Sequence, residues 1–145
     1  MAQRTIWMQL LLIGILSSFQ SCKKVDRSFI EEYNLINKTE YQIDIEVFNR
    51  IDHGYYKSTY NIPKDSVWVQ KIDLDSGSKT GIIALADSVS VIFDNTKILN
   101  FLPYTESPFN ILNQNNYDLI EIKENYHKYT FVINEEMYNN TNFIK

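Results

Sequence analysis

The sequence predicts an all-β protein, an antiparallel β-sandwich (immunoglobulin-like or similar) of about seven to nine strands with a short C-terminal helix. Tyrosine, isoleucine and valine are abundant, whereas glycine occurs only four times, and this composition favours strands over helices. Short stretches with period-two alternation recur about every 8–12 residues. The single cysteine excludes an internal disulfide, so an apolar core must hold the fold. A small barrel is the alternative architecture.

Eight strands are expected in chain order, each bounded by turn residues. The clearest lies at 41–48, where apolar residues such as Ile43 and Ile45 alternate with polar ones, as in a half-buried antiparallel strand. Residues 37–40 are typical of a turn, so the first two strands are expected to form a hairpin. The expected strands cover 33–37, 41–48, 55–62, 67–74, 88–93, 97–101, 117–122 and 126–133.

Four segments lie outside these strands. Residues 75–81 are expected to form the most flexible loop, and the apolar run at 82–87 fits either a buried strand or one helical turn. Residues 103–116 form a long loop whose apolar side chains are expected to pin it to the core. Asn134 is the expected N-cap of the C-terminal helix, which reaches about residue 140. The apolar side chains of the long loop are Phe109, Ile111 and Leu112.

The N-terminus has the pattern of a secretory signal peptide. Arg4 precedes an apolar run of about 14 residues, which is shorter than the roughly 20 residues that span a bilayer. An uncleaved membrane anchor is the alternative. The expected organisation is therefore a signal peptide at 1–21 that is removed, a lipidated cysteine with its linker at 22–29, and a single β domain at 30–145.

Cys22 is the strongest candidate for a chemical role. The tetrad Phe19-Gln20-Ser21-Cys22 resembles a bacterial lipobox, in which a small residue precedes a cysteine whose thiol takes a diacylglycerol. Ser21 and Cys22 fit that pattern, while Phe19 and Gln20 depart from it. Lipidation also accounts for an unpaired cysteine in an exported protein, for which a leftover free thiol is the alternative. Two or more acyl chains would hold the protein durably on a membrane.

The charge balance argues against a nucleic-acid partner. Only Arg4 is charged in the first 21 residues, so the net charge of −4 becomes −5 once the signal peptide is removed. Binding to nucleic acid requires a clustered basic face.

Several segments resemble small uncharacterised lipoproteins of the Bacteroidetes phylum. The resemblance rests on the signal ending at Cys22, on residues 91–97 and 110–117, and on the closing stretch 129–138. It implies a surface or periplasmic lipoprotein and transfers no catalytic residues. In such proteins, acidic residues after the cysteine mark export to the cell surface; here Lys23 and Lys24 precede a single acid, which leaves the leaflet open.

No metal, cofactor or catalytic set is expected. His53 and His127 have no partner ligands at metal-binding spacing. Residues 73–77 are similar to the start of a calcium loop, but Ala84 stands where the bidentate acid is required. The chain has no nucleophile elbow and no phosphate-binding loop, and its acidic pairs at 31–32 and 135–136 are interpreted as solvated.

Two serines are candidate O-glycosylation sites. Ser66 and Ser88 both follow an aspartate and precede a valine, a pattern similar to the acceptor used in exported proteins of the Bacteroidetes; the alternative is a turn that ends before a strand. A set of aromatic residues fits either core packing, which is favoured, or a binding platform. These aromatic residues are Tyr55, Tyr56, Tyr60, Trp68 and Tyr104.

The expected function is that of a membrane-anchored lipoprotein with a non-enzymatic structural or protein-binding role in the bacterial envelope. The expected partners are the membrane, reached through acyl chains on Cys22, and an envelope protein. The outer membrane, on its periplasmic or surface side, is the expected location. A glycan- or small-ligand-binding lipoprotein that uses exposed aromatics is the alternative, and a hydrolase is a weaker one.

Overall fold

The computed structural model describes residues 28–51, 54–74 and 83–144, and they form two β-sheets. Sheet A has four strands in the order β4-β1-β8-β7, and sheet B has five in the order β3-β2-β5-β6-β9. The strands are β1 (Ile30–Asn37), β2 (Ile43–Ile51), β3 (Gly54–Ile62), β4 (Val67–Asp73), β5 (Ser88–Phe93), β6 (Lys97–Phe101), β7 (Asp118–Lys123), β8 (Tyr126–Ile133) and β9 (Asn142–Phe143).

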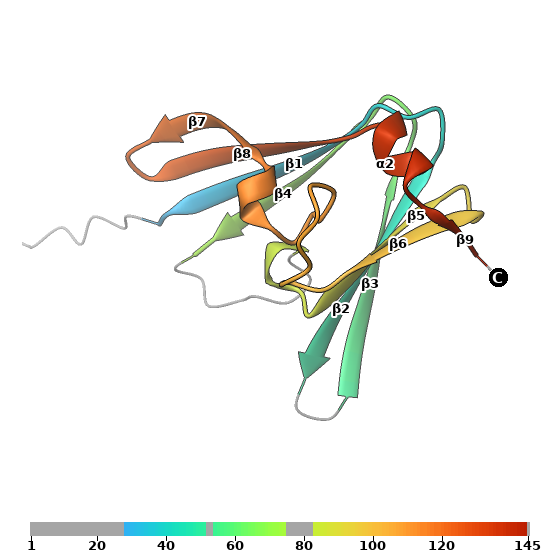
Figure 1. Ribbon diagram of the computed structural model, residues 1–145. Helices are drawn as coiled ribbons and strands as arrows, with labels where there is room; N and C mark the ends of the chain where they lie inside the picture. Colours follow the sequence, from blue (N-terminus) through green and yellow to red (C-terminus); the bar gives the residue numbers. More distant parts are fainter. Residues whose placement is uncertain (1–27, 52–53, 75–82, 145) are drawn as a thin grey trace, which may run out of the picture.

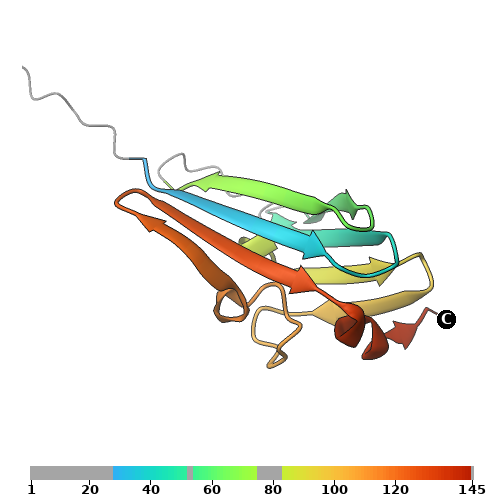
Figure 2. The same ribbon diagram turned by 90° about the horizontal axis from the view of Figure 1, so that it is seen from above.

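The two sheets lie face to face, with β2 and β3 reaching beyond sheet A at one end (Figure 1). Seen from above, the strands of sheet A lie over those of sheet B, and β7 forms one margin (Figure 2). The prediction of an all-β sandwich with a short C-terminal helix is confirmed. The helix α2 (Glu135–Asn139) begins at the expected N-cap, where the Asn134 side chain accepts a hydrogen bond from the Met137 N–H at 3.0 Å.

The strand pairing differs from expectation in two places. β1 and β2 do not form a hairpin, because β1 lies in sheet A and β2 in sheet B. In addition, β1 pairs with β8 in parallel, from Ile30 opposite Tyr126 to Asn37 opposite Ile133, whereas antiparallel pairing was expected throughout. The hairpins β5–β6 and β7–β8 form as predicted.

Asn37 explains why the chain crosses between sheets after β1. In β1 the side chains of Tyr33, Leu35 and Asn37 alternate onto the inner face, which buries the Asn37 amide completely. A buried amide must find hydrogen-bond partners. The Asn37 Nδ2 lies 2.7, 3.1 and 3.2 Å from the carbonyl oxygens of Tyr41, Ile62 and Pro63.

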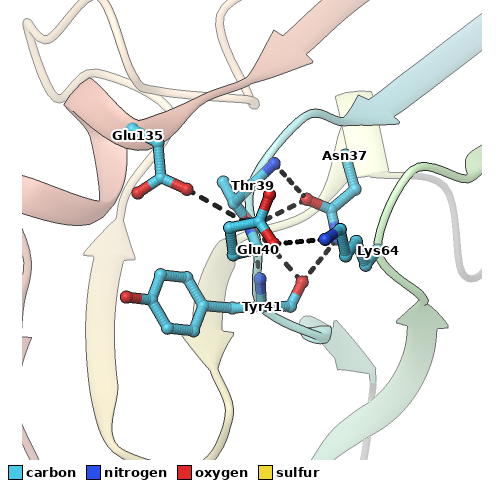
Figure 3. Close-up of polar contacts among 6 residues, drawn as sticks. All are labelled: Asn37, Thr39, Glu40, Tyr41, Lys64 and Glu135. Atoms are coloured by element: carbon cyan, nitrogen blue, oxygen red, sulfur yellow. Dashed lines mark hydrogen bonds and ion pairs between the residues drawn. The ribbon is translucent and has the colours of Figure 1, made fainter.

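The Asn37 carboxamide thereby joins two connections between the sheets (Figure 3). Its Oδ1 accepts hydrogen bonds from the Thr39 N–H at 2.9 Å and from the Thr39 hydroxyl at 2.8 Å, which shapes the turn from β1 into β2. Its Nδ2 reaches the residues that lead from β3 into β4. The start of α2 joins the same cluster, because the Glu135 carboxylate accepts from the Glu40 N–H at 3.0 Å.

The core lies between the sheets and is built from the alternating strands. Ile43, Ile45 and Val47 of β2 are completely buried, as the period-two pattern predicted. The Tyr33 ring of β1 stacks on the Tyr129 ring of β8, with centroids 5.1 Å apart. The other buried apolar residues include Leu35, Ile62, Ile72, Val89, Val91, Phe93, Phe101, Phe131, Ile133 and Met137.

The segment between β6 and β7 is pinned to the core, as expected, by buried Ile111 and Leu112 and by half-buried Phe109. A second buried amide organises it. Asn110 Nδ2 donates to the carbonyls of Leu102 at 3.0 Å and Thr105 at 2.8 Å. The segment ends in a 3-10 turn, η2 (Gln114–Asn116).

The ambiguous run at 82–87 contains a 3-10 turn, η1 (Ile83–Leu85). The short strand β9 was not expected from the sequence. Within the described part of the chain, no helix is long and apolar enough to cross a membrane. The boundaries of the signal peptide, the linker and the β domain remain predictions.

Replacing Asn37 should destabilise the fold strongly. Asn37→Ala removes the donor and acceptor that join residues 39–41 to residues 62–63 and leaves the buried Thr39 N–H without its acceptor, and a buried group left unpaired typically costs about 1–3 kcal/mol. Urea denaturation should therefore show a free energy of unfolding lower by at least that amount. Asn61→Ala is the matched control, because the Asn61 amide makes an exposed hydrogen bond to Asp44. An equal loss in both variants would contradict the role assigned to Asn37.

Candidate functional site

The outer face of sheet A carries a buried carboxylate between two lysines. Glu32 of β1 stands opposite Lys71 of β4 and Lys128 of β8. Its carboxylate oxygens lie 3.1 Å from the Lys71 Nζ and 3.2 Å from the Lys128 Nζ, and the residue is only 6% exposed. The expectation that the acidic pair at 31–32 is solvated is therefore wrong for Glu32, because the long neighbouring side chains cover it.

These contacts keep Glu32 ionised. Burial alone raises the pKa of its carboxyl, but hydrogen bonds from the two lysines, from Tyr126 and from Asn34 together outweigh burial and lower the pKa from 4.5 to about 2. A general acid near neutral pH needs a raised pKa instead. The cluster is therefore suited to holding charge in a fixed place and not to donating a proton.

Lys71, Glu32 and Lys128 form a row across three strands, here called the ionic row. Farther along the strands, the same face of sheet A is apolar. Ile36 of β1 lies opposite Val67 of β4 and Val132 of β8, which makes a row of β-branched side chains across three strands. Val67 and Val132 are exposed, and so is Val69 in the adjacent row. Apolar residues that adjoin on one exposed face are typical of a contact surface.

Asn34 lies between the ionic row and the apolar row, opposite Val69 and Thr130. The residue is buried, and its amide contributes to the hydrogen bonding of Glu32. Its Oδ1 is buried without a hydrogen-bond partner. The centre of the face thus contains an acceptor that the described chain does not satisfy.

The margin of sheet A at β7 is more apolar still. Leu119, Ile120 and Ile122 are 45%, 62% and 67% exposed. In the part of the chain that the structure describes, β7 pairs only with β8, so its other side is open. A register shift between Leu119 and Glu121 marks a β-bulge at Ile120.

Sheet B carries a hollow of about 440 Å³ next to β5 and β6. Polar side chains of Ser88, Ser90, Asn100 and Thr105 contribute to its wall, and the Ser90 hydroxyl donates to the Asn100 Oδ1 at 2.7 Å. The hollow contains no charged side chain. Its chemistry suits a neutral polar group and not a metal ion.

The structure places the two candidate glycosylation sites in different settings. Ser66 is half-buried in the turn before β4, and its hydroxyl donates to the Pro63 carbonyl at 2.6 Å. Ser88 is the first residue of β5 and lines the hollow on sheet B. Their glycosylation stays a prediction. Ser21, Cys22 and His53 lie outside the described residues.

The candidate aromatic residues do not gather in one place. Tyr60 and Trp68 are half-buried against the core with ring centroids 4.8 Å apart, as favoured from the sequence. Tyr55 and Tyr56, by contrast, are exposed neighbours on β3, so they face opposite sides of sheet B. Tyr104 is 94% exposed in the segment between β6 and β7.

His127 and Asp73, the candidate metal ligands among the described residues, do not belong to a metal site. The His127 Nδ1 lies 3.3 Å from the Tyr129 hydroxyl, and its ring packs edge-on against Phe29. Of the calcium-like stretch, Asp73 lies in β4 and residues 75–77 are outside the described chain. Among the described residues, no group of three or more His, Cys, Asp or Glu is placed to hold a metal ion.

Comparisons of the chain with protein-family models, with curated proteins and with solved structures found no match.

The acid stability of the fold should depend on Glu32. Because its folded pKa of about 2 lies below its ordinary value of 4.5, ionised Glu32 stabilises the fold above about pH 4.5, and this contribution is lost as the pH falls toward 2. Glu32→Gln should flatten this part of the pH dependence, measured as urea midpoints between pH 7 and 2. Glu136→Gln, at an exposed position, is the control and should leave the wild-type profile unchanged. Identical profiles for Glu32→Gln and wild type would contradict this role.

Proposed function

We propose that the chain is a lipid-anchored, non-enzymatic lipoprotein of the bacterial envelope, whose β domain binds protein through sheet A. The support for the anchor is the sequence. A signal-type apolar run ends at Ser21-Cys22, and Cys22 is the only cysteine in the chain. Acyl chains on Cys22 then provide the membrane contact, and the outer membrane is the proposed location.

The observation that carries the protein-binding role is the open edge of β7. Edge strands present unpaired backbone groups and are usually protected against contact with other chains. Here the edge displays Leu119, Ile120 and Ile122 to solvent. The β-branched row of β4, β1 and β8 forms a second exposed apolar area, on the outer face of sheet A.

The alternative, a glycan-binding lipoprotein, has less support. An aromatic platform requires rings that converge in a concave site. Tyr55 and Tyr56 point to opposite sides of sheet B, and neither they nor Tyr104 line the hollow on that sheet. An enzymatic role has equally little support, since the buried carboxylate of Glu32 is held ionised by two lysines.

The position of β1 is consistent with a tether at the N-terminus. Residues 22–29 span at most about 3.3–3.6 Å each, so the domain stays within roughly 30 Å of the lipid. β1 starts beside the β7–β8 turn, because the Ile30 N–H donates to the Asn125 carbonyl at 3.0 Å. In this arrangement the tether leaves the domain at the Ile30 end of sheet A.

The anchor is tested by replacing Cys22. In cells that express the full chain, Cys22→Ala should move the protein from the membrane fraction to the soluble fraction or leave it as an unprocessed precursor. Incorporation of labelled fatty acid should be lost completely. Ser18→Ala, which leaves the tetrad intact, is the matched control. If wild type incorporates no fatty acid, the anchoring proposal is wrong.

The protein-binding role is tested separately by pull-down from detergent-solubilised envelopes. Wild type should retain a protein that Ile122→Lys, altered at the exposed edge, does not retain. Ile98→Lys on sheet B is the control for a charge placed elsewhere. If both variants retain the same proteins as wild type, β7 is not the contact edge.

A further inference from the structure

The edge strand β7 has a charge and apolar pattern that is complementary to itself. Opposite β8, Asp118 faces Thr130, and Lys123 faces Tyr126. Thr130 and Tyr126 alternate with the inward-facing Tyr129, so Asp118 and Lys123 lie on the outer face of sheet A. Asp118 and Lys123 thus stand at the two ends of one strand on the same face. Glu121 lies on that face between them, and the Lys123 Nζ lies 2.5 Å from its carboxylate, so in a pair of strands Lys123 would bridge Glu121 of its own copy and an acid of the other.

The apolar residues lie on the other face. Leu119 stands opposite Tyr129, and Ile122 stands opposite His127, so both point to the inner side of sheet A. Nevertheless both are exposed, because sheet B does not cover this margin. An additional strand beside β7 would continue both the charged row and the apolar row.

We propose that this additional strand is β7 of a second copy of the chain. In an antiparallel pair with a two-fold axis between Ile120 and Glu121, Asp118 of each copy lies opposite Lys123 of the other. Leu119 of each copy lies opposite Ile122 of the other. Two ion pairs and two apolar pairs form, and pairs of these kinds stabilise neighbouring strands.

The β-bulge selects this register. After the bulge, between Leu119 and Glu121, the odd- and even-numbered side chains exchange faces of the sheet. A neighbouring strand pairs residue by residue on both sides of the bulge only if its own side chains exchange faces at the same point. In the proposed register the bulged Ile120 of each copy lies opposite Glu121 of the other. On both sides of the axis, outward Asp118 then meets outward Lys123 and inward Leu119 meets inward Ile122. A shift by one residue would place Lys123 opposite an inward apolar side chain.

The resulting assembly is closed. Two four-stranded sheets join into a single sheet of eight strands in which the β7 edge of each copy is used once and β4 forms the two outer margins. The inference rests on the proposed protein-binding role of β7 and names its partner, but it does not require the lipid anchor. In a membrane-bound form the two tethers would start at opposite ends of the joined sheet, because the pairing is antiparallel and β1 begins next to the β7–β8 turn.

Disulfide crosslinking tests the register. The full chain with Cys22→Ala contains no cysteine and no anchor, so this test is independent of lipidation. Leu119→Cys and Ile122→Cys are introduced separately into this background and oxidised alone or mixed. The mixture should form a disulfide-linked dimer, because opposite residues have Cβ atoms about 4.5–5.5 Å apart. Each variant alone should remain uncrosslinked.

Charge reversal tests the ion pairs within the same assay. Lys123→Asp should lower the yield of the mixed dimer by roughly tenfold or more, since it places two acids opposite each other. Adding Asp118→Lys restores opposite charges in the swapped order and should restore the yield. Circular dichroism spectra of all variants verify that the β fold is retained.

Three results would overturn the proposal. One is a mixture that gives no dimer although both variants fold. Another is Ile122→Cys alone crosslinking as efficiently as the mixture, which indicates a different axis. The last is a Lys123→Asp variant whose mixed-dimer yield equals that of the parent. Crosslinking of Ile122→Cys in cells to a different protein, without the dimer, would assign the edge to another partner.

Discussion

The buried carboxamide of Asn37 is the interaction on which the rest of this sandwich depends. A small β domain without disulfides must hold its two sheets in register through packing and hydrogen bonds alone. One side chain at the end of β1 fixes the turn into β2 through Thr39 and also reaches Ile62 and Pro63 at the end of β3. Two of the crossings between the sheets, after β1 and after β3, are thereby held at one corner. In the segment before β7, the buried carboxamide of Asn110 likewise donates hydrogen bonds to backbone carbonyls, those of Leu102 and Thr105.

The two ends of the outer face of sheet A differ in polarity. A row with buried, ionised Glu32 lies toward the start of β1, and a row of β-branched side chains lies toward its end. A partner bound to such a face would be held in one orientation, because reversing it would place apolar groups on charges. The open margin at β7 adds a second asymmetry, since its charges stand at opposite ends of one strand. Together these features distinguish sheet A from the more polar outer face of sheet B.

Much of the fold was predictable from local pattern. The alternation in β2 correctly gave its buried face, and turn residues between short apolar strands correctly gave the hairpins β5–β6 and β7–β8. The crossing after β1 was missed, because residues 37–40 fit a hairpin turn equally well. The available signal was Asn37 itself, which continues the inward alternation of Tyr33 and Leu35. Glu32 was missed for a different reason: its burial depends on Lys71 and Lys128, which are distant in sequence and come together only through strand pairing.

The parallel pairing of β1 with β8 also determines when the domain can be completed. β1 emerges first from a ribosome or an export channel, yet one of its two neighbours lies close to the C-terminus. Contacts between distant parts of a chain form slowly and only when both parts are available. Sheet B can assemble its four longer strands earlier, because β2, β3, β5 and β6 precede β7 in the chain. Pairing of β1 with β8 is therefore a late step, and a chain truncated before β8 would leave β1 paired on one side only.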